Sequence, residues 1–201
     1  MNYQVILEDT LKNLDGKKKL LLHACCAPCS SYVIEYLSNY FDITILYYNP
    51  NIDTKEEFDK RLSELNRFLK EFKTKNSVKV ISLGYDKNDY LKEIDGLEEE
   101  KEGGKRCLKC YKLRLEKACI YSKENNFDYF TTTLTISPHK NSKVLNEMGS
   151  CLEEKYQMPY LYSDFKKKEG YKRSIVLSKE YNLYRQDYCG CIYSKRDKQV
   201  E

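Results

Sequence analysis

Cysteine is the residue type in this chain whose number and spacing point most directly to chemistry. The chain has nine cysteines in 201 residues. Seven of them fall in three short stretches: Cys25, Cys26 and Cys29 in "HACCAPCSS", Cys107 and Cys110 in "KRCLKCYK", and Cys189 and Cys191 in "YCGC". Thiolates are the ligands that select soft metal ions and iron–sulfur clusters. The three stretches together therefore predict a metal centre, a redox centre or both.

Each stretch also has a simpler interpretation when it is taken alone. A single C-x-x-C is common in structural zinc sites and in thioredoxin-like dithiols. A C-x-C pair can close into a strained disulfide, and strained disulfides suit redox cycling better than support. A four-thiolate zinc site would use four of the seven cysteines and leave three unexplained. The two remaining cysteines, Cys119 and Cys151, lie at helical spacing from Leu115 and Met148, and we expect both to be small core residues.

Length and composition favour one globular domain over residues 1–201. The chain is 41% hydrophobic and 33% charged, with a net charge of +4. No apolar run approaches the roughly 20 residues that span a bilayer, so we expect no membrane partner. The N-terminus carries acidic residues where a signal peptide needs a basic start. We therefore expect a cytoplasmic protein, in which metal binding or redox chemistry explains the cysteines better than structural disulfides do.

Apolar runs alternate with charged amphipathic segments, which is typical of an α/β fold with a parallel sheet. The predicted strands are residues 19–24, 42–49, 78–84 and 128–135, with a less regular fifth at 158–164. The predicted helices include residues 53–72, 140–156 and 172–182. Thr54 and Glu57 form a capping-box pattern at the start of the first of these helices. The fold expected is a Rossmann-like parallel sheet with flanking helices, related to the PP-loop and HUP-type nucleotide-binding folds.

The first cysteine stretch lies where the first predicted strand passes into a helix. In an open parallel sheet, ligands bind beyond the carboxyl ends of the strands. The stretch "HACCAPCSS" occupies the place of a phosphate-binding loop but lacks the glycines that such a loop requires. The sequence therefore predicts a cysteine-rich metal site at the C-terminal ends of the strands.

With these motifs in place, the sequence resembles the QueH family of epoxyqueuosine reductases. The resemblance is collinear and runs from Lys18 to Ser194. It rests on "LLLHACCAPCSS", "YYNPNI", "EEFDKR", "RCLKCYKLRL", "FTTTLTISPHKN" and "DFKKKEGYKRSIVLSKEYNLYRQDYCGCIYS". The resemblance implies an enzyme that reduces epoxyqueuosine to queuosine at the wobble position of tRNA.

The resemblance also implies a [4Fe–4S] cluster with a second metal centre close by, for which a mononuclear iron is the candidate. The cluster ligands that it implies are Cys25, Cys26, Cys107 and Cys110. Cys29, Cys189 and Cys191 then remain for the second centre or for a redox-active dithiol, and the partition of the seven thiols stays open. No flavin or nicotinamide fingerprint is present, so we expect an external electron-donor protein.

Proton transfer and substrate binding have candidates near the predicted site. Cys29, Cys189, Cys191 and Asp187 are the catalytic candidates, with Asp187, Tyr188 or water supplying protons. Tyr47, Asn49 and Asn51 follow the second strand, and Ser137 and His139 follow the fourth, so these residues are candidates to bind the extruded base. The basic run of Lys166, Lys167, Lys168, Lys172 and Arg173 is the candidate track for tRNA phosphates. The simpler alternatives are a turn around Asn49 and a solvated basic face.

Two other functions stay open from the residues alone. One is a zinc-stabilised RNA-binding module without catalysis. The other is an ATP-dependent tRNA sulfur-transfer enzyme, against which the missing glycine-rich loop argues.

Overall fold

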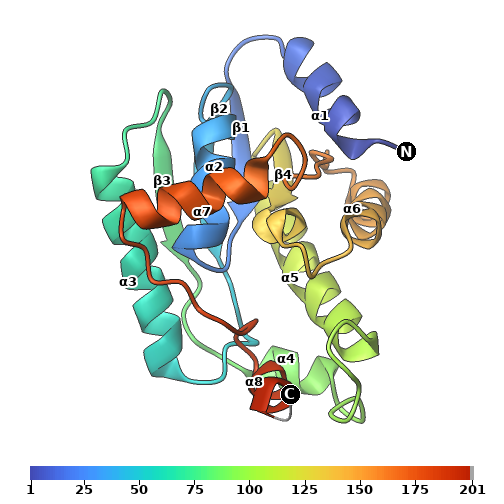
Figure 1. Ribbon diagram of the computed structural model, residues 1–201. Coiled ribbons are helices and arrows are strands. Elements are labelled where there is room, and N and C mark those ends of the chain that lie inside the picture. The colour runs from blue at the N-terminus through green and yellow to red at the C-terminus, as the bar shows by residue number, and fades with distance from the viewer. Residues whose placement is uncertain (200–201) are drawn as a thin grey trace.

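The computed structural model describes residues 1–199, and its centre is a four-stranded sheet in the order β3-β2-β1-β4 (Figure 1). The strands are β1 (Lys18–His23), β2 (Phe41–Tyr47), β3 (Val78–Ser82) and β4 (Tyr129–Thr132). All three pairings are parallel. The predicted α/β fold with a parallel sheet is therefore confirmed, whereas the relation to PP-loop and HUP-type folds and the single domain over residues 1–201 stay predictions.

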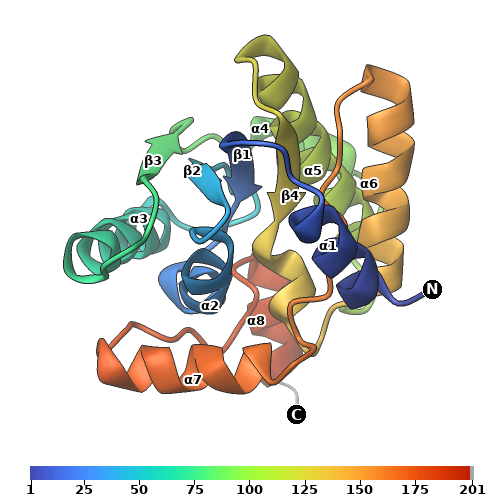
Figure 2. The same cartoon turned by 90° about the horizontal axis from the view of Figure 1, so that it is seen from above.

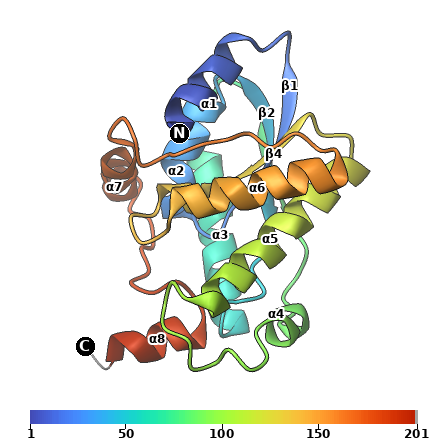
Figure 3. The same ribbon diagram turned by 90° about the vertical axis from the view of Figure 1, so that its right-hand side faces the viewer.

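Helices cover both faces of the sheet (Figure 2). The helices in chain order are α1 (Tyr3–Lys12), α2 (Ala27–Leu37), α3 (Lys55–Glu71), α4 (Asn88–Glu93), α5 (Lys105–Glu124), the 3-10 helix η1 (Thr133–Ile136), α6 (Ser142–Tyr156), α7 (Gly170–Glu180) and α8 (Ile192–Gln199). Helices α2 and α3 lie on one face of the sheet, with α7 outside α2 (Figure 2). Helices α5 and α6 lie on the other face, with α6 across α5 (Figure 3).

The strand β1 is apolar on both faces because both faces are covered. Leu20 and Leu22 pack in the core between the sheet and α2 and α3, whereas Leu21 packs toward α5 and α6. A strand buried on both sides shows a continuous apolar run in place of an alternating one. The apolar run before the first cysteine stretch is thus a consequence of the central position of β1.

Two predicted elements differ from the structure. The predicted fifth strand forms a single bridge, between Tyr160 and Phe130, because Asn146 takes the next backbone groups by bonding both N–H and C=O of Ser163. The fourth strand ends at Thr132, where the Thr132 hydroxyl accepts a hydrogen bond from the backbone N–H of Leu134 and starts η1. The predicted Thr54 cap of α3 is present, with its hydroxyl accepting from the N–H of Glu57 at 3.2 Å.

The strand order fixes where a ligand site can form. The chain runs from β1 to β2 to β3 on one side and then returns to place β4 on the other side of β1. This reversal between β1 and β4 is a topological switch point, at which the loops diverge and leave a crevice. The strands run toward the end of the molecule where α4 and α8 lie (Figure 1). Within residues 1–199, no helix combines the length and the apolar character needed to cross a membrane.

Candidate metal and redox site

The first group of thiols is built by the turn from β1 into α2. Cys26 is the N-cap of α2, and Pro28 lies in the first turn, where its missing N–H costs nothing. This short turn brings the sulfurs of Cys25, Cys26 and Cys29 within 4.8 Å of one another. We call these three residues the strand-end thiols. They form, among the described residues, the group with spacing suited to a single metal ion.

The surroundings of the strand-end thiols shift their pKa values in opposite directions. Hydrogen bonds from Cys26 and Cys29 hold the pKa of Cys25 well below its ordinary value, and the charges of Lys140 and Arg114 lower it further. The pKa of Cys26 is raised to about 12, chiefly by its hydrogen bond to Cys25 and by burial, while the charge of Arg61 opposes the rise. The surroundings thus favour ionisation of Cys25 over ionisation of Cys26, and thiolates are the form that binds metals.

The second group of thiols lies at the start of α5 and in the turn before α8. Cys107 and Cys110 are three residues apart in the first turns of α5, so both face the same side of the helix. Cys110 and Cys191 share a small apolar cluster with Tyr90 and Ile94. Burial raises the pKa of Cys110 to about 12, with Arg114 opposing and the thiolates of Cys189 and Cys191 adding to the rise.

Thiols of both groups line one pocket of about 910 Å³. Cys25 and Cys29 line it from the β1 side and Cys189 lines it from the C-terminal turn. The loop after β4 contributes Ser137 and His139. Asp187 is exposed at the same pocket. The structure thus brings predicted residues from three separate stretches to the switch point between β1 and β4.

Arg114 is a site residue that the sequence analysis missed. Its side chain is 1% exposed, its Nε donates to the carbonyl of Cys110 at 3.2 Å, and it lines the pocket. A buried guanidinium needs negative charge nearby, yet among residues 1–196 no carboxylate forms an ion pair with Arg114, and its Nη2 has no hydrogen-bond partner there. The thiols of Cys110, Cys189 and Cys25 lie within electrostatic range of the guanidinium and would supply that charge when ionised as metal ligands. The signal was available, since Cys107, Cys110 and Arg114 share one helical face at spacings of three and four.

The donor set fits an iron–sulfur cluster. Cys25, Cys29 and Cys189 line the pocket together with the cationic side chains of Arg114 and Lys140, which would offset the charge that several thiolates bring. Cys107 and Cys110 lie outside the 4.8 Å group of the strand-end thiols. A cluster with four thiolate ligands needs one thiol more than the three in that group. The assignment of Cys25, Cys26, Cys107 and Cys110 to one cluster stays a prediction.

The residues after β2 have internal partners. The hydroxyl of Tyr47 donates to the carbonyl of Phe58 at 2.9 Å in the core. The amide of Asn49 donates to the carbonyl of Ala24 at 2.9 Å, so it fixes the strand-end turn. Asn51 is also buried, at 3% exposure. Contact of these three residues with a substrate stays a prediction, and the present hydrogen bonds of Tyr47 and Asn49 give those two a structural role.

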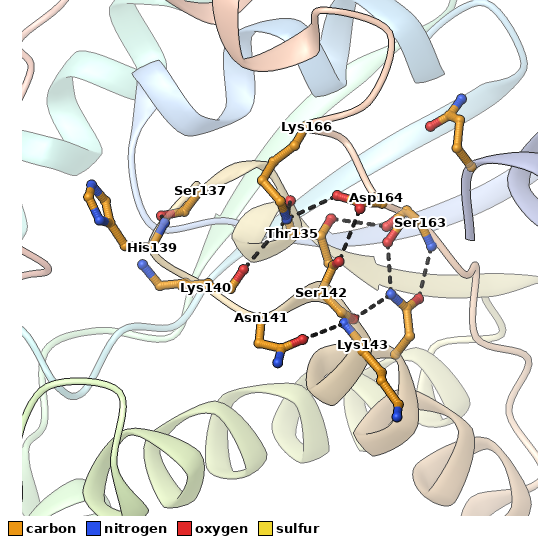
Figure 4. A network of polar contacts seen from close by, with 12 residues as sticks. Thr135, Ser137, His139, Lys140, Asn141, Ser142, Lys143, Ser163, Asp164 and Lys166 are labelled. Carbon is orange, nitrogen blue, oxygen red and sulfur yellow. Dashed lines mark hydrogen bonds and ion pairs between the residues drawn. The ribbon is translucent and has the colours of Figure 1, made fainter. Parts of the chain in front are cut away.

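The loop after β4 is held by one of the predicted phosphate-binding lysines (Figure 4). Nζ of Lys166 donates to the carbonyl of Thr135 at 2.9 Å and pairs with Asp164 at 3.0 Å. It also donates to the carbonyl of Lys140 at 3.5 Å. The hydroxyl of Ser142 donates to Asp164 at 3.0 Å, which ties the start of α6 to the same network. Lys166 therefore supports the loop that lines the pocket.

The rest of the basic run is divided between ion pairs and solvent. Arg173 donates to both carboxylate oxygens of Glu35, Lys168 pairs with Glu8, and Lys172 pairs with Glu169. Lys167 is exposed, and its backbone N–H closes a turn on the carbonyl of Asp164. Exposed ion pairs of this kind are weak and exchange readily with a phosphate. A role for Lys167, Lys168 and Arg173 in binding phosphates stays a prediction.

The two cysteines predicted to be core residues differ from each other. Cys119 is fully buried, and its thiol lies 3.8 Å from the carbonyl of Leu152. Cys151 is exposed, so the core prediction for it was wrong. The neighbouring Leu152 takes the core position on α6, which turns Cys151 to the outer face.

Comparison with known proteins supplies the observation that decides the family. A family model described as epoxyqueuosine reductase QueH matches residues 20–197. The chain belongs to the QueH family. The epoxyqueuosine reductase QueH of Streptococcus pyogenes serotype M1 is 42% identical over 206 residues, which cover 100% of this chain and 81% of that protein. The resemblance that the cysteine motifs predicted is therefore confirmed.

Two further relatives show how widely the family match extends. The epoxyqueuosine reductase QueH of Staphylococcus epidermidis is 41% identical over 208 residues, covering 100% of this chain and 87% of that protein. The epoxyqueuosine reductase QueH of Thermotoga maritima is 32% identical over 188 residues, covering 90% and 94%. QueH family members thus match this chain across the strand-end thiols, α5 and the C-terminal turn together.

Proposed function

We propose that this QueH family member reduces epoxyqueuosine to queuosine at the wobble position of tRNA. The observation that carries the proposal is the meeting of the strand-end thiols with Cys189 at one pocket on the switch point of the sheet. The names of the relatives supply the substrate. Removal of an epoxide oxygen requires two electrons and protons, which suits a pocket lined by thiols and open to solvent.

The proposal includes a [4Fe–4S] cluster held by Cys25, Cys26, Cys107 and Cys110. Cys29, Cys189 and Cys191 remain for a second iron or a redox-active dithiol. When bound, these groups supply single electrons and a Lewis acid for the epoxide oxygen. An external protein is the proposed electron donor, and a cytoplasmic location is part of the proposal because tRNA and reduced thiols are both found there.

The chain's own residues would receive and orient the substrate base. A base must leave its stack to enter a pocket of this kind, and its edge needs hydrogen-bonding partners. Ser137 and His139 lie on the wall of the pocket and are the proposed contacts there, with Tyr47, Asn49 and Asn51 supporting the neighbouring turn. Asp187 is the proposed proton donor because it is exposed at the pocket, whereas the hydroxyl of Tyr188 donates to Asp53 at 3.1 Å.

The cofactor is tested by anaerobic purification followed by a visible spectrum and by assays of iron, sulfide and zinc. The proposal predicts a coloured protein with at least about four irons and an equivalent amount of sulfide per chain. Incubation with a reductant and tRNA that contains epoxyqueuosine should then give queuosine in the digested tRNA. A colourless zinc protein that binds RNA without turnover would favour the zinc-stabilised binding module.

Phosphate binding by the basic run is tested by tRNA affinity across a salt series. Each phosphate contact releases condensed counterions, so affinity falls with salt, and each lost contact makes the fall shallower. Replacing both Lys167 and Lys168 with Ala should reduce the slope of log affinity against log salt concentration by roughly one to two units. Binding of modified and unmodified tRNA should be weakened equally. A matched control replaces the exposed Lys73 and Lys75, which precede β3 at the opposite edge of the sheet. Equal slopes in the two double variants would show that the basic run is only a solvated face.

A further inference from the structure

Arg61 contacts the C-terminal cysteine turn from a distant part of the chain. It lies in α3, is 1% exposed, and its Nε pairs with Glu57 at 2.6 Å. Its Nη1 donates to the carbonyl of Cys189 at 3.4 Å. The ring of Tyr188 lies 5.3 Å from its guanidinium carbon. One fixed guanidinium thus holds two consecutive residues of the cysteine turn.

The backbone next to Arg61 completes the attachment. The carbonyl of Gly190 accepts a hydrogen bond from the N–H of Asp53 at 2.9 Å, and the carboxylate of Asp53 accepts from Tyr188. Gly190 has φ +119°, and a Cβ there would lie 3.1 Å from Nη1 of Arg61 and 3.3 Å from Cγ1 of Ile52. Glycine is therefore required both by the backbone conformation and by the close approach of Arg61.

Arg61 is also within electrostatic range of the strand-end thiols. Its charge acts to lower the pKa of the Cys26 thiol, opposing the rise that the hydrogen bond to Cys25 and burial cause. Its Nη2 is buried and makes no hydrogen bond with the described residues. Arg61 therefore bonds the cysteine turn directly and interacts electrostatically with the strand-end thiols.

We propose that Arg61 is a positioning residue that fixes the Cys189-Gly190-Cys191 turn relative to the strand-end thiols. The inference rests on the proposed function only in giving that turn a redox role, because the contacts themselves do not depend on a cofactor. Without Arg61, the turn keeps its covalent connection to α7 and α8 but loses the side chain that joins it to α3. The two thiols of the turn then sample positions away from the pocket.

Arg67 gives a matched control on the same helix. It pairs with Glu64 and Glu71, and its Nη2 donates to the carbonyls of Tyr181 at 2.9 Å and Asn182 at 3.3 Å. It therefore attaches the same C-terminal segment to α3, but at the end that precedes the cysteine turn. Loss of Arg67 loosens the segment without releasing the turn itself.

The experiment measures alkylation rates of Cys189 and Cys191 by mass spectrometry in the reduced, metal-free full chain. Arg61→Met and Arg61→Lys are compared with Arg67→Met and Arg67→Lys. In Arg61→Met we expect both thiols to be alkylated about tenfold faster than in the wild type, because a hydrogen bond that holds the turn is lost. In Arg67→Met we expect the rate to rise less than about twofold. Arg61→Lys keeps the charge and the pairing with Glu57 but lacks the several N–H donors of the guanidinium, so its alkylation rate should lie between those of the wild type and Arg61→Met. This variant should also remain folded if Arg61→Met does not.

A second measurement separates positioning from general loosening. In Arg61→Lys loaded with metal, iron content and tRNA affinity should match the wild type, while the rate of queuosine formation at saturating tRNA should fall about tenfold. Alkylation rates equal to the wild type in both Arg61 variants would overturn the proposal. Equal acceleration in the Arg61 and Arg67 variants would overturn it too. Faster alkylation in the Arg61 variants, together with a metal-loaded wild type that makes no queuosine, would leave the positioning role intact and refute the proposed function.

Discussion

The strand-end thiols and the C-terminal cysteine turn reach the same pocket by different means. The strand-end thiols are neighbours in the chain, and the passage from β1 into α2 brings their sulfurs together. The C-terminal turn is held by Arg61 and Asp53, which lie 128 and 135 residues away from the groups that they bind. The first arrangement is encoded locally, and the second depends on the finished fold.

The two regions also differ in what stabilises them. The turn into α2 is anchored by a central strand whose leucines are fully buried, and burial of such side chains contributes about 1.5–3 kcal/mol each. The C-terminal turn is held by a few hydrogen bonds, each contributing about 1 kcal/mol. The strand-end thiols are therefore the rigid part of the site, and the C-terminal turn is the part that small changes can displace. Rigid ligands suit a resident metal, and an adjustable pair suits a redox step.

The largest expected effect is loss of the metal when a strand-end thiol is removed. Cys25→Ala or Cys26→Ala removes a proposed ligand from a turn held rigidly by β1 and α2. Iron content should fall below about a tenth of the wild-type value, and turnover should disappear. Cys151→Ala, on the exposed face of α6, is the control for cysteine loss itself. Full iron content in either ligand variant would show that the metal is held elsewhere.

A smaller effect is expected from crowding the C-terminal turn. Gly190→Ala places a methyl group against Arg61 in a backbone conformation that costs about 1–3 kcal/mol for other residues. The turn should shift, so that iron is retained while turnover falls at least about tenfold. Gly84→Ala has a similar positive φ but nothing within 4 Å of the added group, so it reports the strain alone. Equal losses of turnover in the two variants would show that contact between the added methyl group and Arg61 is not the cause.

The smallest effects separate the two cysteines outside the site. Cys119→Ala leaves a cavity between α5 and α6 and should lower the free energy of unfolding by about 1 kcal/mol. Cys151→Ala changes an exposed side chain and should stay within about 0.5 kcal/mol of the wild type. Urea unfolding of both variants without metal measures the difference. A greater loss in Cys151→Ala would mean that its face of α6 is covered in solution.

The sequence predicted those features that depend on neighbours in the chain. The buried strand β1, the capped start of α3 and the position of Cys25 and Cys29 at the end of β1 all follow from local patterns. The resemblance located the family because its motifs are collinear with the chain.

The features that the sequence did not predict depend on tertiary contacts. Arg61 looks like one more charged residue of an amphipathic helix until the C-terminal turn packs on it. In the sequence Lys166 is part of a basic run, and only the fold shows that its Nζ donates to the carbonyl of Thr135. The predicted fifth strand is absent because the side chain of Asn146 bonds the backbone N–H and C=O of Ser163, which a strand would have paired with its neighbour. Such contacts join residues that no spacing rule relates.

In the proposed division of roles, the strand-end thiols hold the metal while the C-terminal turn takes part in the redox step. This division is tested most directly by removing one thiol of the C-terminal turn at a time. Iron, sulfide and queuosine formation would be measured together in anaerobically prepared Cys189→Ala and Cys191→Ala, with wild type and Cys26→Ala alongside. The account predicts that both C-terminal variants retain most of the iron and sulfide but form no queuosine, whereas Cys26→Ala loses both. Loss of iron in the C-terminal variants in proportion to activity, or wild-type queuosine formation in either of them, would contradict the account.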